Sequence, residues 1–221
     1  MTKKTLLQTN IGLLLFTGIP AFISYVFYAA LGHYLWPEYN RLTQDISSLG
    51  AEGAPNQEKL FPFITAYAVF LFIFVTVYVF ASFYRNRTWG VKIGSILLLL
   101  MSVISKYGYS MFPLEGDKTQ MTFQNMMHIV TTVLVVFLSI GALFSIAFGY
   151  RKRAESKRFG TFVLFSAIVF TLLGMTNPIG MGAGLNLLGL TERLAIYSLH
   201  LIIAVLGIWE AKSLLAGRKS T

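Results

Sequence analysis

The sequence contains no cysteine and few charged residues, and both shortages limit what the chain can be. Without cysteine there is no disulfide framework, no zinc–thiolate site and no thiol chemistry. Charged residues make up only 12% of the 221 residues and apolar residues make up 55%. An average soluble protein has about 25% charged residues. A water-soluble fold of this length could not bury so much apolar surface, so the composition favours an integral membrane protein.

Six apolar runs are each long enough to cross a hydrocarbon core of roughly 30 Å. We expect an all-α, six-transmembrane-helix bundle that forms one domain over residues 1–221, with the first run retained as a helix because it exceeds a typical signal-peptide core. Pro20 should kink that first helix. The predicted helices span approximately residues 11–31, 63–83, 91–111, 127–148, 159–176 and 195–215.

The glycine-rich stretch NPIGMGAGLNLLGL follows the fifth predicted helix and is still apolar. Non-helical backbone at membrane depth must be sheltered by protein or water. The stretch is therefore either an interfacial cap or a partly re-entrant loop, and we favour the cap.

The net charge of +9 is unevenly distributed between alternate loops. The N-terminus, the loops YRNRTWGVK and YRKRAESKR, and the C-terminal tail hold 13 Lys and Arg but only 2 acids. The other loops, 32–62, 112–126 and 177–194, hold with the adjoining helix ends 5 Lys and Arg and 7 acids. Because basic loops tend to remain in the cytoplasm, we expect both termini to be cytoplasmic. The basic excess then reflects topology and attraction to membrane lipids, and it argues against nucleic-acid binding.

Polar side chains gather on the predicted outer side, where three helices each carry a polar stripe on one face. The stripes consist of Ser102, Lys106 and Tyr109; of Gln124 and His128 with Thr131 or Thr132; and of Arg193, Tyr197 and His200. An ionisable group as deep as Lys106 usually faces the bundle interior and pairs with another group. We therefore expect an outward-facing polar pocket among the third, fourth and sixth helices.

The first outer loop contains the stretch DISSLGAEGAP. Asp45 is expected to cap a short helix by accepting from the amide of Ser47 or Ser48, with Gly50 as its stop. If the loop folds down onto the bundle, Asp45 could also reach Lys106 or Arg193. The second outer loop, which contains FPLEGD, would then cover the same pocket with Glu115 or Asp117.

Four of these motifs occur together and in order: DISSLGA, FPLEGD, a histidine opening the fourth helix, and GLTER opening the sixth. Over nearly the whole chain this pattern resembles a prokaryotic six-helix membrane family known as domain of unknown function 998. The resemblance implies a bacterial plasma membrane location and supplies no reaction. It leaves open whether Glu115 or Asp117 is the motif acid, and it marks as motif positions Asp45, Ser47, Pro113, His128, Glu192 and Arg193.

The first functional interpretation is an outward pocket that binds a lipid head group or small amphiphile, or carries such a ligand or protons. Cationic and imidazole side chains lining it would capture an anionic group or move a proton. The ligand-binding residues would be Lys106, Tyr109, Glu115, Asp117, Gln124, Glu192, Tyr197 and His200.

The second interpretation is a metal-dependent or acid–base enzyme that modifies a lipid at the outer leaflet. Asp45, Ser47, His128 and Arg193 would be its catalytic residues, with Ser47 as nucleophile and Arg193 or Lys106 holding an oxyanion or phosphate. Asp45, His128 and His200 could hold a zinc ion, which accepts three protein ligands and a water. A b-type haem between the two histidines is disfavoured, because such carriers usually contain more histidines within the membrane.

The third interpretation is purely structural. In it, Lys106, Asp45, Glu192 and Arg193 form an ion-pair network that holds the outer loops, and the histidines only donate hydrogen bonds near the interface.

Overall fold

The computed structural model describes residues 3–116 and 120–216, and its long elements are all helices. In those residues, six helical segments are long and apolar enough to cross a membrane, which confirms the predicted number of spans. The helices are α1 (Lys3–Leu15), α2 (Gly18–Leu35), η1 (Ser47–Gly50), α3 (Gln57–Tyr84), α4 (Trp89–Met111), α5 (Phe123–Arg151), η2 (Ala154–Ser156), α6 (Lys157–Gly182) and α7 (Leu188–Ala216).

The first span is broken rather than smoothly bent. Helix α1 ends at Leu15 and α2 begins at Gly18, so the break lies just before Pro20. Proline is tolerated in the first turn of a helix, where its missing N–H would have no intrahelical partner. The predicted disturbance of this helix is confirmed, and its position follows from that preference.

Helix α6 extends further than the sequence predicted. The expected end was residue 176, but the helix continues through the NPIGMG segment to Gly182. Only residues 183–187 turn back toward α7, with Gly184 in the left-handed region at φ 70°. The interfacial cap expected for this stretch is therefore helical over its first half, because the apolar side chains continue and only the later glycines end the helix.

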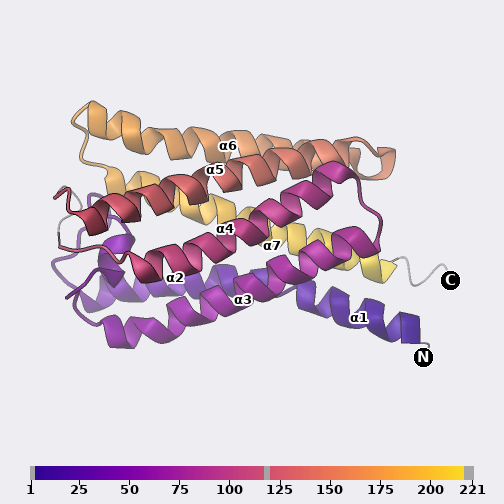
Figure 1. The fold of residues 1–221 in the computed structure, drawn as a ribbon, viewed down its shortest axis with the longest axis horizontal. Coiled ribbons are helices and arrows are strands. Elements are labelled where there is room, and N and C mark those ends of the chain that lie inside the picture. Colours follow the sequence, from indigo (N-terminus) through magenta and orange to yellow (C-terminus); the bar gives the residue numbers. More distant parts are fainter. Residues whose placement is uncertain (1–2, 117–119, 217–221) are drawn as a thin grey trace.

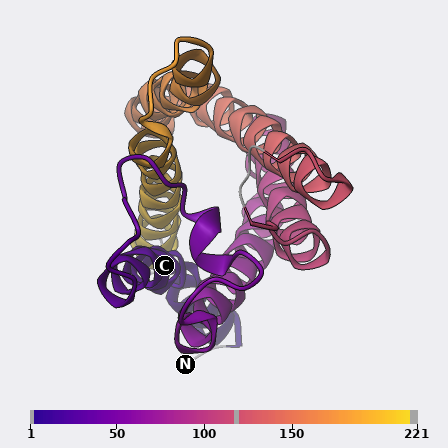
Figure 2. The same ribbon diagram turned by 90° about the vertical axis from the view of Figure 1, so that its left-hand side faces the viewer.

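The membrane helices form a closed ring. Helix α2 packs on α3, followed by α4, α5, α6 and α7, and α7 packs back on α2, while α1 packs on α7 and α3. Figure 1 shows these helices running along one long axis with both termini at the same end. Figure 2 shows the ring from the opposite end, with the segment between α2 and α3 crossing over it.

We call the end that carries residues 85–88, 152–156 and the termini the terminal end, and the opposite end the loop end. The loop end carries the first loop (residues 36–56), the second loop (112–116 and 120–122) and the third loop (183–187). A small core of buried residues attaches the first loop to α2 and α3, and its members are Tyr28, Ala29, Tyr39, Ile46, Leu49 and Leu60. The first loop is therefore a packed cover over the ring.

Helices α4 and α5 approach each other through glycine. A Cβ atom added to Gly90 would lie 2.7 Å from the Ser145 carbonyl oxygen and 2.8 Å from the Cα of Gly149. Small residues let two helices come into backbone contact within a membrane, where apolar side chains alone provide little driving force for association. This contact fixes the α4–α5 wall, on which two of the predicted polar stripes lie.

Replacing Gly149 with leucine should force α4 and α5 apart, because a Cβ there would collide with the backbone of Val91. We expect a loss of about 1–3 kcal/mol in the free energy of unfolding, typical of overpacking. Thermal unfolding in detergent, followed by circular dichroism, measures it. Gly174→Leu is the matched control, because a Cβ at Gly174 meets nothing within 4 Å. Equal melting temperatures for the two variants would contradict the close approach.

Candidate functional site

Arg193, at the start of α7, holds the first loop down. Its Nη1 donates to the carbonyl oxygens of Arg41 at 2.9 Å, Gln44 at 3.0 Å and Gly189 at 2.8 Å, and its Nη2 donates to the Tyr39 hydroxyl. A guanidinium suits this role because it offers several N–H donors in one rigid plane. Arg193, which was predicted to hold an oxyanion or phosphate, thus bonds the backbone of the first loop.

Tyr39 connects Arg193 to the middle of the first loop. Its hydroxyl donates to the carbonyl oxygens of Asp45 at 2.6 Å and Gln44 at 3.2 Å, and its ring lies 5.4 Å from the Arg193 guanidinium carbon. Burial raises the pKa of the Tyr39 phenol to about 12, although the adjacent Arg193 lowers it in part. The phenol is therefore protonated at neutral pH and stays a donor.

Three other residues of the GLTER motif also contact the first loop. The Glu192 carboxylate accepts from the Ile46 amide at 2.6 Å, and the Leu190 amide donates to the Leu42 carbonyl at 3.1 Å. A Cβ on Gly189 would lie 2.6 Å from the Arg41 carbonyl oxygen. Glycine is needed there because loop and helix meet at backbone distance.

Asp45 accepts from the Ser48 amide, as the sequence predicted, although the residue directly before the short helix η1 is Ile46. Its Oδ1 accepts from the Ser48 amide at 3.0 Å and also from the Ser48 hydroxyl, and the residue is only 2% exposed. The carboxylate is therefore bonded to the serine after Ser47, the predicted nucleophile. A serine nucleophile requires an adjacent base, and the contacts of Asp45 serve loop structure.

The second loop is organised by Asn125, which the sequence interpretation missed. Its Oδ1 accepts from the Glu115 amide at 2.9 Å, and its Nδ2 donates to the carbonyls of Glu115 at 3.0 Å and Gln120 at 2.9 Å. The Glu115 carboxylate accepts from the Thr122 hydroxyl at 3.2 Å. A fully buried amide at the start of α5 thus shapes the loop. Asp117, the other predicted acid, lies outside the described residues.

His128 joins α5 to the end of α4. Its Nδ1 lies 2.9 Å from the Phe112 carbonyl oxygen, and its ring centre lies 4.9 Å from that of Tyr109. The Tyr109 hydroxyl donates to Thr132 at 3.1 Å, and Gln124 donates to the Met111 carbonyl at 3.4 Å. The polar stripes predicted on these two helices therefore meet. Because a carbonyl only accepts, Nδ1 carries the proton, and the neutral ring is basic at Nε2.

His200 lies deeper, between α7, α2 and α3. Its Nδ1 donates to the Ile196 carbonyl at 2.7 Å, and its Nε2 lies 2.7 Å from the Tyr67 hydroxyl. The ring stacks on Tyr25 with centres 4.8 Å apart, and Tyr197 meets the same Tyr25 edge-on at 6.4 Å. Nδ1 of His200 is thus bonded within α7, and Nε2 joins α7 to α3.

Two expectations about the pocket need correction. In residues 3–116 and 120–216, no group of three His, Asp or Glu side chains is placed to hold a metal ion, and Asp45, His128 and His200 are not brought together as such a group. Lys106 is exposed, although it was expected to turn inward and pair. It lies near the end of α4, where a long aliphatic stem lets the ammonium group reach water.

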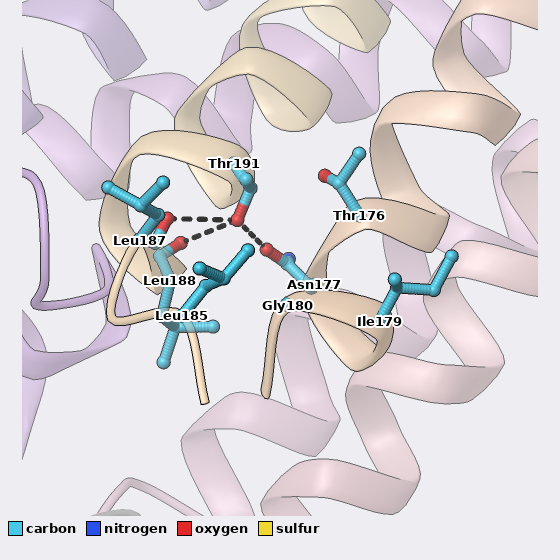
Figure 3. Close-up of a pocket in the computed structure, with 8 residues that line it drawn as sticks. All are labelled: Thr176, Asn177, Ile179, Gly180, Leu185, Leu187, Leu188 and Thr191. Atoms are coloured by element: carbon cyan, nitrogen blue, oxygen red, sulfur yellow. Dashed lines mark hydrogen bonds between the residues drawn. The ribbon is translucent and has the colours of Figure 1, made fainter. Parts of the chain in front are cut away.

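A pocket opens at the loop end between α6 and α7, and its volume is about 210 Å³ (Figure 3). Residues of α6 line one side, and leucines of the third loop and of α7 line the other (Figure 3). The Thr191 hydroxyl is bonded to the Asn177 side chain and approaches the Leu187 and Leu188 carbonyls at 3.1 and 3.2 Å. The lining residues are Thr176, Asn177, Ile179, Gly180, Leu185, Leu187, Leu188 and Thr191.

The sequence interpretation missed this pocket because its residues lie in the stretch assigned to a cap. The available signal was the leucine content of GLNLLGL, which is higher than an exposed turn requires. The predicted polar pocket among α4, α5 and α7 stays a prediction.

The family model described as "Protein of unknown function (DUF998)" matches residues 19–209. No curated protein and no solved structure matched the chain.

Proposed function

Because the chain belongs to the DUF998 family, which is described only as of unknown function, we propose its function from its own residues: it binds a lipid or another small amphiphile at the loop end. The observation that carries this proposal is the apolar pocket between α6 and α7 (Figure 3). Ligand sites are typically concave and mostly apolar, with a few polar groups that fix orientation.

The exposed side chains around the pocket support an apolar ligand. Ile179 is 62% exposed, Leu185 57% and Leu187 42%. All three line the pocket, Ile179 from α6 and the two leucines from the third loop. In a membrane protein, exposed apolar side chains such as these contact the hydrocarbon of lipids. The hydrocarbon tail of an amphiphile would cover these side chains, and the hydroxyl of Thr191 would lie beside its polar end.

Exposed cations at the loop end favour a ligand with an anionic head group. Arg41 is exposed, and its backbone lies against Arg193 at the start of α7, close in the chain to the pocket residue Thr191. Lys106, exposed near the end of α4, adds a second cation at the loop end. Cationic side chains at the membrane surface attract anionic head groups by about 1 kcal/mol each.

The charge distribution supports an orientation in which the loop end faces away from the cytoplasm of a plasma membrane. Both termini lie at the terminal end (Figure 1), whose segments hold 13 of the 18 Lys and Arg. Cytoplasmic loops carry such an excess. In this orientation the pocket takes its ligand from the outer leaflet.

Filling the pocket should weaken amphiphile binding. The Cβ position of Gly180 lies 4.0 Å from Leu185, so Gly180→Leu places an isobutyl group in the pocket. Electron paramagnetic resonance of a doxyl-labelled stearic acid measures binding to the purified protein as an immobilised component. We expect Gly180→Leu to weaken binding about tenfold, since about 1.4 kcal/mol of apolar burial is lost.

Gly182→Leu is the matched control, because a Cβ at Gly182 meets nothing within 4 Å and the residue does not line the pocket. This variant should bind like the wild type. An immobilised component that is absent from the wild type, or equal in both variants, would contradict the proposal.

A further inference from the structure

A buried charged cluster lies at the terminal end, far from the pocket. Glu210 of α7 is 1% exposed, and its Oε2 is 3.1 Å from Nη1 of Arg85 and 2.9 Å from Nη2 of Arg87. Its Oε1 accepts from the hydroxyl of Tyr150, which is 3.2 Å from that of Tyr78. One carboxylate thus serves two guanidinium groups and a phenol.

A tight turn after α3 places both arginines beside Glu210. Asn86 has a φ of 45°, in the left-handed region that asparagine tolerates better than most residues. The Asn86 amide donates to the Phe83 carbonyl and the Arg87 amide to the Ser82 carbonyl, both at 2.9 Å. These are the two bonds of a Schellman motif. The reversal brings Arg85 and Arg87, two positions apart, to the same acceptor.

Glu210 and Ser213 accept from both guanidinium groups, but two positive charges face one carboxylate and one donor of Arg87 is left over. Arg87 is 8% exposed, and its Nε has no hydrogen-bond partner in the part of the chain that the structure describes. Buried donors are nearly always satisfied in native proteins. The missing partner of Arg87 Nε is therefore an acceptor, and two guanidinium groups beside one carboxylate favour an anion there.

The surroundings of the turn are also cationic. Lys92 donates to the Asn86 side chain at 3.1 Å, and Arg153 donates to the Asn86 carbonyl at 2.7 Å. Burial, followed by repulsion from Arg87, lowers the pKa of the Arg85 guanidinium. The Arg85 side chain is 21% exposed, so a ligand outside the bundle can reach the cluster at Arg85.

We propose that the turn at residues 85–88 binds the phosphate group of an anionic lipid in the leaflet at the terminal end, with Arg85 and Arg87 as its guanidinium partners. Guanidinium groups recognise phosphate oxygens through paired hydrogen bonds. Basic pockets between membrane helices bind anionic head groups in this way. The site is separate from the pocket between α6 and α7 and does not depend on the function proposed for that pocket.

Native mass spectrometry of the full-length protein in detergent tests the site, with phosphatidylglycerol, phosphatidylcholine and inorganic phosphate added in separate titrations. We expect the wild type to retain phosphatidylglycerol in preference to phosphatidylcholine. Arg85→Gln should weaken phosphatidylglycerol retention about tenfold, while Arg87 still pairs with Glu210. Arg158→Gln, which removes an exposed cation at the same end, should leave retention unchanged.

Thermal unfolding of each variant separates lost binding from lost structure, and Arg85→Lys is the second variant if Arg85→Gln fails to fold. Lysine keeps the charge but not the paired donors, so it should retain the lipid less well than arginine. Equal retention of both lipids by the wild type, or an equal loss in Arg158→Gln, would overturn the proposal. Saturation by inorganic phosphate without any preference for phosphatidylglycerol would overturn the lipid as the source of the anion.

Discussion

Glu210→Ala is expected to cost about 3–5 kcal/mol of stability, because it leaves Arg85 and Arg87 largely buried without their carboxylate. The guanidinium nitrogens lie 3.1 and 2.9 Å from that carboxylate, and Tyr150 also donates to it. Removing one partner of a buried charge pair is far more costly than removing an exposed one, because the remaining charge is not solvated. Chemical or thermal unfolding in detergent, followed by circular dichroism, measures the loss.

Glu155→Ala is the matched control, because Glu155 is an exposed acid at the same end of the bundle. Surface substitutions of this kind usually change stability by less than about 0.5 kcal/mol. Glu210→Gln should fall between the two, since it keeps an acceptor for Tyr150 but loses the charge. A Glu210→Ala variant as stable as Glu155→Ala would show that the carboxylate does not hold the arginines.

Arg193→Ala should release the first loop from the bundle. The change removes donors from the carbonyls of Arg41, Gln44 and Gly189 and from the Tyr39 hydroxyl. Hydrogen bonds to charged groups contribute about 1.5–3 kcal/mol each but are not additive, so we expect a local loss of at least about 2 kcal/mol. Hydrogen–deuterium exchange of the first loop measures it as faster exchange, while the helices in the membrane stay protected.

Arg193→Lys distinguishes charge from geometry. A lysine keeps the positive charge, but its single nitrogen can replace only one of the two guanidinium nitrogens that bond the loop, Nη1 or Nη2. We therefore expect part of the increase in exchange to remain. Arg41→Ala is the control, because the Arg41 side chain is exposed and only its backbone carbonyl contacts Arg193. Wild-type exchange in Arg193→Ala would mean that the small core of the first loop holds it without Arg193.

The motif positions at the loop end share a physical role. Asp45 accepts from an amide of η1, and Glu192 and Arg193 bind the first loop, while His128 joins α5 to α4. These contacts hold the loops over the ring of helices, and Arg193 makes its share of them through backbone carbonyls and a phenol. The ion-pair network expected among Lys106, Asp45, Glu192 and Arg193 stays a prediction. A rigid cover of this kind also fixes the start of α7, which forms one side of the pocket in Figure 3.

The sequence by itself determined the six spans, the end of the bundle at which the polar stripes lie, and the bond that Asp45 accepts from Ser48. Each of these depends on residues close together in the chain. An apolar run of about 20 residues can satisfy its backbone inside a membrane only as a helix. Such a bond needs only an acceptor side chain within three residues of the amide, and the chain provides Asp45 and Ser48 at that spacing.

Only the tertiary structure decided the partners. Glu210 meets Arg85 although 125 residues separate them, and Arg193 meets Gln44 across 149 residues. No local pattern connects such pairs, because they form only when the ring closes and α7 packs against α2. The pocket between α6 and α7 required the unexpected length of α6, and the exposure of Lys106 required the position of α4 in the ring. Helical periodicity assigns a side chain to one face of its helix, whereas packing of the neighbouring helices decides what that face meets.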